Sequence, residues 1–182
     1  MKAVLDACVI YPTVLREILV GVAARGLYEP LWSERILREW VLATAKLGLV
    51  VQRQAEGEAV AMRAAFPRAM VRAQPDIERR LLLPDAGDVH VLAVAVAAHA
   101  DCIVTFNARD FPRHVLAEEG IARRDPDGLL WELWSHHPAA VAGVVQAVHG
   151  VAEAMAGGVV PLKALLKRAQ LPKLGRALLA QD

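Results

Sequence analysis

The protein has 182 residues, a formal net charge of +1, 55% hydrophobic residues and 23% charged residues. This length can bury a core of ordinary size, and the composition excludes a disordered chain. The net charge is near zero and no basic tail indicates non-specific nucleic-acid binding, so such binding must depend on local patches. Both cysteines, Cys8 and Cys102, lie in apolar runs, and we interpret them as core residues of a reducing compartment.

Two apolar segments bear on localisation. The N-terminal run contains Asp6, so we expect no signal peptide. The segment 138–160 contains Gln146, His149 and Glu153, which a bilayer core would rarely accept. We therefore predict a cytoplasmic protein with no membrane association.

Strand-like and helix-like patterns alternate along the first two thirds of the chain. Short apolar or β-rich runs predict strands, and apolar residues three or four positions apart predict helices. The predicted strands are Lys2–Ile10, Leu27–Trp32, Ala69–Ala73, Arg79–Leu83, Cys102–Phe106 and Ile121–Arg124. The predicted helices are Thr13–Arg25, Glu34–Leu47 with Ser33 as N-cap, Val51–Phe66, Val89–His99 and Phe111–Glu119.

This alternation predicts an α/β fold with a parallel sheet and right-handed crossovers. In such a sheet the carboxyl ends of all strands lie at one edge, together with the starts of the helices that follow. Asp6 ends the first strand, and Asp88 begins a helix that follows a strand. Asn107 and Asp110 follow a further strand. Glu39 lies on a helix that also begins after a short strand. We therefore expect these oxygen-bearing side chains to converge.

Most of these acids also have a purely structural interpretation. Asp85 and Asp88 stand where helix N-terminal caps are found, and acids there stabilise a helix by about 1 kcal/mol or less. Glu39 has Arg35 four residues earlier, and Asp110 suits a turn.

Asp6 is different, because a lone carboxylate in a buried strand is costly without a partner. Converging acids repel one another and take up protons unless a divalent ion neutralises them. Ligands that are all oxygen favour Mg²⁺ or Mn²⁺.

Three segments together resemble the PIN domain, the fold of the VapC-type toxin ribonucleases. They are VLDACVIYP, WSERILREW and LPDAGDVHVLAVAVAAHADCIVTFNARDFP. The likeness covers about Lys2 to Trp134. It implies a parallel five-stranded sheet flanked by helices, in a three-layer PIN-like domain over residues 1–134, with a helical C-terminal extension over residues 135–182.

The resemblance also implies an active site and a cofactor. Asp6, Glu39 and Asp88 match the family's Mg²⁺ or Mn²⁺ ligands, and Asn107 and Asp110 match its further catalytic positions. Thr105 and Asp85 correspond to supporting positions behind the ligands. Where the family usually has hydroxyl or amide side chains after the first Asp, this chain has Ala7 and Cys8, which we expect to loosen Asp6.

By the same resemblance, the protein is a metal-dependent endoribonuclease that hydrolyses RNA phosphodiester bonds, and the toxin of a toxin–antitoxin pair. A divalent ion would invert the charge of the acidic site, orient the phosphate and lower the pKa of a bound water. Phosphate contacts are expected from Arg16, Arg109 or Arg113. His90 lies two residues after Asp88, so its side chain should point away from that acid.

Two other interpretations remain open on sequence alone. The first is another Mg²⁺-binding α/β enzyme, a haloacid-dehalogenase-type phosphatase or a phospho-receiver domain. The former needs a second Asp where Cys8 stands, and the latter needs an acidic pair ahead of its phospho-acceptor. The second is a PIN-like module with little catalytic activity that binds RNA or a partner protein, which Ala7, Cys8 and the neutral Asn107 keep open.

The chain beyond Trp134 shows amphipathic helices without a recognisable site. They are predicted from the Val-rich stretch 141–151, then at Leu162–Gln170 and Lys173–Gln181. The resemblance implies two partners besides RNA, namely a small antitoxin protein and a second copy in a homodimer.

Overall fold

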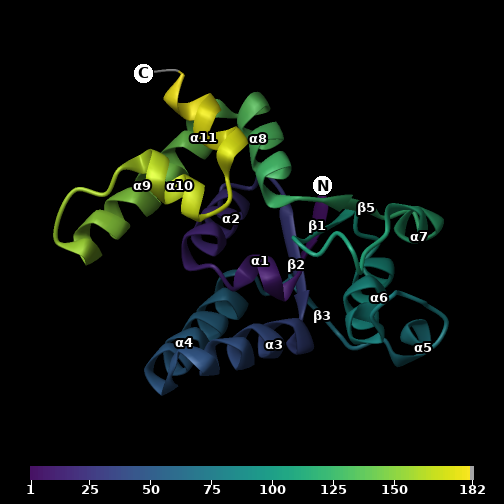
Figure 1. Ribbon diagram of the computed structural model, residues 1–182. Coiled ribbons are helices and arrows are strands. Elements are labelled where there is room, and N and C mark those ends of the chain that lie inside the picture. Colours follow the sequence, from purple (N-terminus) through teal and green to yellow (C-terminus); the bar gives the residue numbers. More distant parts are fainter. Residues whose placement is uncertain (181–182) are drawn as a thin grey trace. The chain divides into compact units, whose positions relative to one another are not determined.

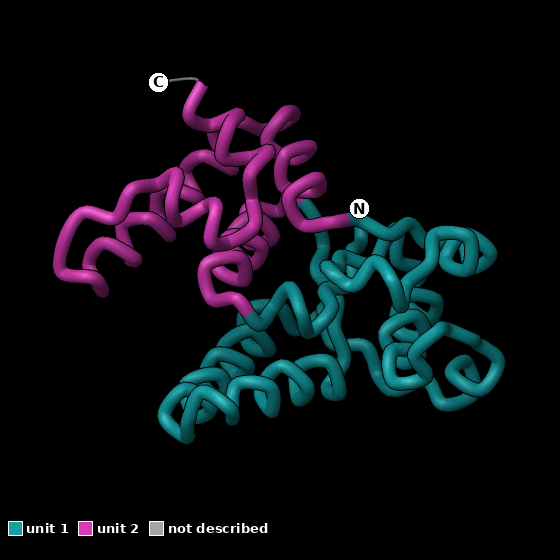
Figure 2. Tube along the Cα trace, viewed as in Figure 1, with its two compact units in different colours: residues 1–11, 28–124 teal, residues 12–27, 125–182 magenta. Residues whose placement is uncertain are grey.

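The computed structural model describes residues 1–180. Within the described chain, residues 1–11 and 28–124 form one compact unit, and residues 12–27 and 125–180 form a second (Figure 2). We refer to them as unit 1 and unit 2. The division after Arg124 differs from the boundary at residue 134 expected for the PIN-like domain, which stays a prediction.

Unit 1 is built around a five-stranded sheet in the order β3-β2-β1-β4-β5. Every neighbouring pair of strands is parallel. The strands are β1 (Lys2–Leu5), β2 (Glu29–Ser33), β3 (Met70–Val71), β4 (Cys102–Val104) and β5 (Ala122–Arg124). The predicted α/β fold with a parallel five-stranded sheet flanked by helices is confirmed.

Helices flank these strands (Figure 1). They are α1 (Ala7–Ile10), α3 (Glu34–Thr44), α4 (Leu49–Ala65), α5 (Pro75–Glu78), α6 (Val89–Ala97) and α7 (Arg113–Glu118), with 3₁₀ turns η1 (Ala45–Leu47) and η2 (Ala86–Asp88). Ser33 caps α3 as predicted, because its hydroxyl accepts a hydrogen bond of 3.2 Å from the Ile36 amide. The helix α6 packs against β1, β2 and β4, which explains why it is apolar on nearly every side.

Two strand predictions were wrong. The run Lys2–Ile10 is a strand only as far as Leu5, and its second half is the helix α1. Asp6 makes this change of direction, since its backbone is extended while its carbonyl already accepts hydrogen bonds from Val9 and Ile10. The predicted strand Arg79–Leu83 is irregular, and the short helix α5 precedes it with Pro75 in its first turn.

The core of unit 1 is formed by the inner strands and the helices that cover them. Val4, Ile103 and Leu92 are completely buried, as expected for strands covered on both faces. Trp32 packs edge-on against Phe66 with ring centroids 5.8 Å apart. Trp32 and Trp40, which bracket the Glu39 helix, are both buried and act as packing anchors.

Unit 2 is a set of packed helices, α2 (Thr13–Ala24), α8 (Pro126–His136), α9 (Pro138–Ala156), α10 (Leu162–Arg168) and α11 (Pro172–Leu179). A Cβ at Gly21 of α2 would lie 2.7 Å from Val144 of α9, so glycine allows these helices to approach closely. Asp127 of α8 accepts hydrogen bonds from the amides of Lys173 and Leu174 and thereby caps α11. The predicted helical C-terminal region is confirmed. The predicted helix end at Gln181 lies outside the described residues.

Helix α9 is long and apolar enough to cross a membrane by length and composition alone. Its most apolar stretch of 18 residues has a mean hydropathy of 1.4, and 17% of that stretch is buried. Its buried residues are Val141, Val144 and Val145, and it packs against α2 and α8. Its last turns carry His149 and Glu153, which contact the carbonyl and the amide of Val160. A single helix of this kind is weak evidence for a membrane span, because core helices also meet the criterion.

Candidate metal centre

The candidate site begins where β1 and β4 end. These two strands are neighbours in the sheet. The strand that follows β1 in the chain, β2, lies on one side of this pair, and the strand that follows β4, β5, lies on the other. At such a point a crevice is expected outside the carboxyl ends of the two strands. Asp6 follows β1, and its amide donates a hydrogen bond of 3.1 Å to the carbonyl of Val104 at the end of β4. Thr105 follows β4 directly. The predicted convergence of these strand ends is therefore present.

The Asp6 carboxylate is buried and held by two side-chain donors. The Thr105 hydroxyl donates to its Oδ2 atom at 2.6 Å, and the Cys8 thiol donates to the same atom at 3.0 Å. Burial, and then the charge of Asp6, raise the pKa of the Cys8 thiol to about 12, so the thiol keeps its proton. The expectation that Cys8 would loosen Asp6 was wrong, because the thiol replaces the missing hydroxyl.

Asp85 and Asp88 are placed by the turn η2. Asp85 accepts a hydrogen bond of 2.7 Å from the Gly87 amide, which confirms its predicted role as an N-terminal cap. The Asp88 amide donates to the Asp85 carbonyl at 3.2 Å. The tight turn therefore places two carboxyl groups close together at the start of α6.

Asn107 connects this turn to the loop that follows β4. Its amide nitrogen Nδ2 donates to Asp88 Oδ2 at 3.1 Å, and its Oδ1 accepts from the Asp110 amide at 3.3 Å. Its own backbone amide donates to the Thr105 hydroxyl at 2.9 Å. Asn107 thus orients Asp88 and Asp110 rather than presenting a free oxygen.

Three carboxylates form the acidic cluster, Asp85, Asp88 and Asp110, whose ligand oxygens all lie within 4.8 Å of one another. The pKa of Asp88 is raised to about 6, by burial first and then by the negative charges of Asp6, Asp85, Asp110 and Glu39. A divalent cation would remove this repulsion, and the carboxylate donors suit a hard ion such as Mg²⁺ or Mn²⁺. The residues present therefore fit a metal ion.

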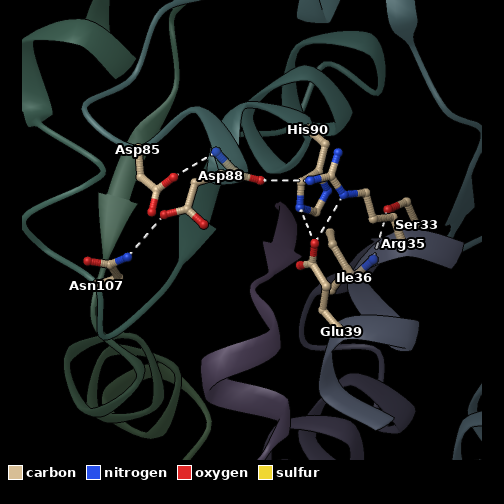
Figure 3. A network of polar contacts seen from close by, with 9 residues as sticks. Ser33, Arg35, Ile36, Glu39, Asp85, Asp88, His90 and Asn107 are labelled. Atoms are coloured by element: carbon tan, nitrogen blue, oxygen red, sulfur yellow. Dashed lines mark hydrogen bonds and ion pairs between the residues drawn. The ribbon is translucent and has the colours of Figure 1, made fainter. Parts of the chain in front are cut away.

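Glu39 lies beside the acidic cluster but is engaged elsewhere (Figure 3). Its Oε1 atom accepts a hydrogen bond of 3.0 Å from Arg35 Nε and lies 3.0 Å from His90 Nε2. Burial opposes ionisation of Glu39, but His90 and Arg35 outweigh it and lower the pKa of this carboxyl. His90 is buried and faces Glu39 rather than Asp88.

Arg35 also joins the Glu39 helix to the turn of the acidic cluster. Its Nη2 atom donates to the Gly87 carbonyl at 3.1 Å, and Gly87 lies between Asp85 and Asp88. Figure 3 shows this chain of contacts from Asn107 through the turn to Glu39. The pairing of Arg35 with Glu39 expected from their spacing is present, and it serves the site as well as the helix.

The structure therefore brings together part of the predicted ligand set. Asp88 belongs to the acidic cluster as predicted, and Asp85 and Asp110 join it directly. Among the described residues, Asp6 and Glu39 are not in that group of carboxylates, although both are close enough to raise the pKa of Asp88. The assignment of Asp6 and Glu39 as ligands stays a prediction.

The arginines predicted to contact phosphate differ in accessibility. Arg16 in α2 is only 3% exposed and lies 3.5 Å from Glu17, so it does not present its guanidinium to a ligand. Arg109 and Arg113 are both exposed, on either side of Asp110. Sequence reasoning missed Arg123, which donates to two carbonyls of the Asp110 loop. No local pattern around Arg123 distinguishes it from an ordinary edge-strand residue.

Comparison with known proteins identifies a family. The family model described as PIN domain matches residues 2–109, which include Asp6, Glu39, Asp85, Asp88, Thr105 and Asn107. No curated protein and no solved structure matches the chain. PIN domains are nucleases that typically use divalent metals, and the match spans more than half of this sequence. The chain belongs to the PIN domain family.

Proposed function

We propose that the protein is a divalent-metal-dependent ribonuclease that hydrolyses phosphodiester bonds at the acidic cluster. The observation that carries this proposal is the acidic cluster, in which the ligand oxygens of Asp85, Asp88 and Asp110 lie within 4.8 Å of one another. Burial first, and then the neighbouring acids, raise the pKa of Asp88 to about 6. Such an arrangement disfavours the folded protein in isolation and becomes favourable when a cation is bound.

Asp88, Asp85 and Asp110 would hold the ion, with the Asp6 carboxylate close by. A bound Mg²⁺ or Mn²⁺ supplies positive charge for the phosphate and lowers the pKa of water. We propose Mg²⁺ or Mn²⁺ because all side chains offered are oxygen donors.

The protein's own residues orient this site. Asn107 fixes Asp88 through its amide group, and Thr105 and Cys8 fix Asp6. Arg35 and His90 hold Glu39 in its ionised form at the rim. Hydrogen-bonded supporting residues of this kind keep carboxylates in place when a ligand binds.

RNA is the proposed substrate, and exposed arginines supply its contacts. Arg109 and Arg113 are exposed and lie one and three residues from Asp110 in the sequence, so their guanidinium groups are accessible to phosphates of a bound RNA. Such contacts are independent of base sequence. Removing either arginine should therefore weaken binding of all RNAs alike.

The test is cleavage of structured and unstructured RNA by purified protein with Mg²⁺, with Mn²⁺ or with EDTA. The wild type should cleave only with metal, and Asp88→Asn should not cleave. Glu56→Gln is the matched control, because Glu56 is an exposed acid of α4. Cleavage by Asp88→Asn at the wild-type rate would refute the proposal. A wild type that binds RNA without cleaving it would instead support a binding module.

We further propose that the protein is the toxin of a toxin–antitoxin pair and acts in the cytoplasm as a homodimer. Support comes from large apolar side chains that α3, η1 and α4 leave exposed, namely Leu42, Leu47, Leu49, Val50 and Val60. Exposed apolar side chains gathered on neighbouring elements are typical of protein interfaces. Growth arrest on expression would support the toxin proposal, and normal growth would refute it. A molar mass of two chains by light scattering would support the homodimer, and the mass of one chain would refute it.

A further inference from the structure

Arg123 holds the loop that carries Asp110. This residue lies in the middle of the edge strand β5, and its Nη1 atom donates to the Ala108 carbonyl at 2.7 Å and to the Phe111 carbonyl at 3.0 Å. The two carbonyls lie on either side of Asp110 in the sequence. One guanidinium group therefore joins both sides of this segment to the sheet.

The anchoring strand is itself well fixed. β5 pairs in parallel with β4 from Cys102 to Val104, and the Thr105 amide donates to the Arg124 carbonyl at 3.0 Å. The position of Arg123 is thus set by the same strand end that positions Thr105 and Asp6.

Other contacts also fix the loop around Asp110. The Asp110 amide donates to Asn107 Oδ1 at 3.3 Å, a long hydrogen bond. Phe111, the next residue, is completely buried and anchors the far side of the loop. Asp110 has to lie near Asp88 despite the repulsion between their charges, so its loop needs an attachment that does not depend on the carboxylates.

We propose that Arg123 is a positioning residue of the metal centre, which fixes Asp110 relative to Asp85 and Asp88 through the backbone of its loop. This inference rests on the proposed function, because it assigns a cation to the acidic cluster. Arg123 binds backbone carbonyls, so its hold on the loop does not depend on an ion pair with an acid of the cluster.

The charge of Arg123 and its hydrogen bonds have opposite effects on cation affinity. Removing a positive charge near the acidic cluster should strengthen binding of a cation through electrostatics alone. Losing the two carbonyl contacts should weaken binding, because the carboxylates lose their common geometry. The direction of the change therefore distinguishes positioning from charge.

The experiment measures Mn²⁺ binding by isothermal titration calorimetry for the wild type, Arg123→Gln, Arg123→Lys and the control Arg72→Gln. Arg72 is exposed and follows β3. We expect Arg123→Gln to weaken Mn²⁺ binding by about 10-fold, the lower end of typical losses for supporting residues. Arg123→Lys carries its donor on a longer side chain than Gln and should lose less, and Arg72→Gln should match the wild type. Unchanged or tighter binding by a folded Arg123→Gln would overturn the inference.

Amide hydrogen exchange of residues 107–111, measured without metal, separates this inference from the proposed function. Faster exchange in Arg123→Gln supports the positioning role, and unchanged exchange overturns it, even if the wild type binds no Mn²⁺. Absence of Mn²⁺ binding by the wild type would refute the metal site alone. If Arg123→Gln does not fold, Arg123→Met decides, since it keeps an unbranched side chain and carries no donor for the two carbonyls. Wild-type affinity and wild-type exchange in that variant would contradict the proposal.

Discussion

The Thr105 hydroxyl donates a hydrogen bond of 2.6 Å to the Asp6 carboxylate and so joins the carboxyl ends of β4 and β1. The same hydroxyl accepts a hydrogen bond of 2.9 Å from the Asn107 amide. One side chain therefore orients a buried acid and begins the loop that leads to Asp110. This contact links the core of the sheet to the acidic cluster.

Thr105→Val keeps the shape of the side chain and removes the hydroxyl that contacts Asp6, the Asn107 amide and the Cys8 thiol. Because the Asp6 carboxylate then loses the shorter of the hydrogen bonds that Thr105 and Cys8 donate to it, we expect the free energy of unfolding to fall by about 1–3 kcal/mol, measured by urea denaturation. Nuclease activity should fall with it. Cys8→Ser retains a donor to Asp6 and should preserve both properties. Equal stability of Thr105→Val and wild type would show that this hydrogen bond does not hold Asp6.

Much of the fold was predictable because strand and helix patterns alternate along the chain. That order implies a parallel sheet and brings Asp6, Thr105 and Asn107 to one edge. The change from β1 to α1 was missed because Ala7–Ile10 is as apolar as the strand before it. The short helix α5 and the irregular 79–83 segment were missed for a similar reason, since short runs carry little periodicity.

The site was predictable in its residue types but not in its pairings. Sequence spacing placed His90 away from Asp88, as observed, but spacing cannot show that His90 meets Glu39 of a distant helix. The spacing of Arg35 and Glu39 predicted their ion pair, whereas the bond from Arg35 to the Gly87 carbonyl depends on tertiary packing. Asp85 acts as a cap, and the tight turn makes it a member of the cluster as well.

Asp88→Asn should stabilise the protein in the absence of metal. The pKa of Asp88 in the folded protein is about 6, raised by burial and neighbouring acids, whereas an unfolded Asp titrates near 4. Ionisation of Asp88 therefore destabilises the fold above about pH 6, and this penalty disappears as the pH falls through 6 toward 4.

We expect Asp88→Asn to raise the melting temperature by about 2–4 °C at pH 7.5 in EDTA, for a gain of about 1 kcal/mol after allowing for solvent screening. The measurement is differential scanning calorimetry, with Glu56→Gln as the control. A lower melting temperature for Asp88→Asn would mean that its charge is already compensated in the metal-free protein.

Metal binding should depend on pH in the range where Asp88 titrates. The ion has to displace the proton from Asp88, so affinity for Mn²⁺ should rise as the pH increases through about 6. For one such proton the rise from pH 5 to pH 7 is about tenfold, with little further change above pH 7. Calorimetric titration at several pH values measures it. Affinity independent of pH between 5 and 7 would exclude Asp88 as a ligand.

Arg35→Ala should impair the site more than it destabilises the fold. The Arg35–Glu39 pair is half exposed, with side chains 52% and 39% accessible, so its loss should cost less than about 1 kcal/mol. Release of the Gly87 carbonyl loosens the turn between Asp85 and Asp88, and we expect nuclease activity to fall about 3- to 10-fold. Arg38→Ala on the exposed side of α3 is the control. Equal activity of the two variants would remove Arg35 from the site.

The position of Mn²⁺ in crystals of the protein, located by anomalous diffraction, tests the metal centre most directly. We expect a peak within bonding distance of carboxylate oxygens of Asp88, Asp85 and Asp110, and no such peak in crystals of Asp88→Asn. A peak bound elsewhere on the chain, or none at millimolar Mn²⁺ with these side chains ordered, would contradict a metal centre at the acidic cluster.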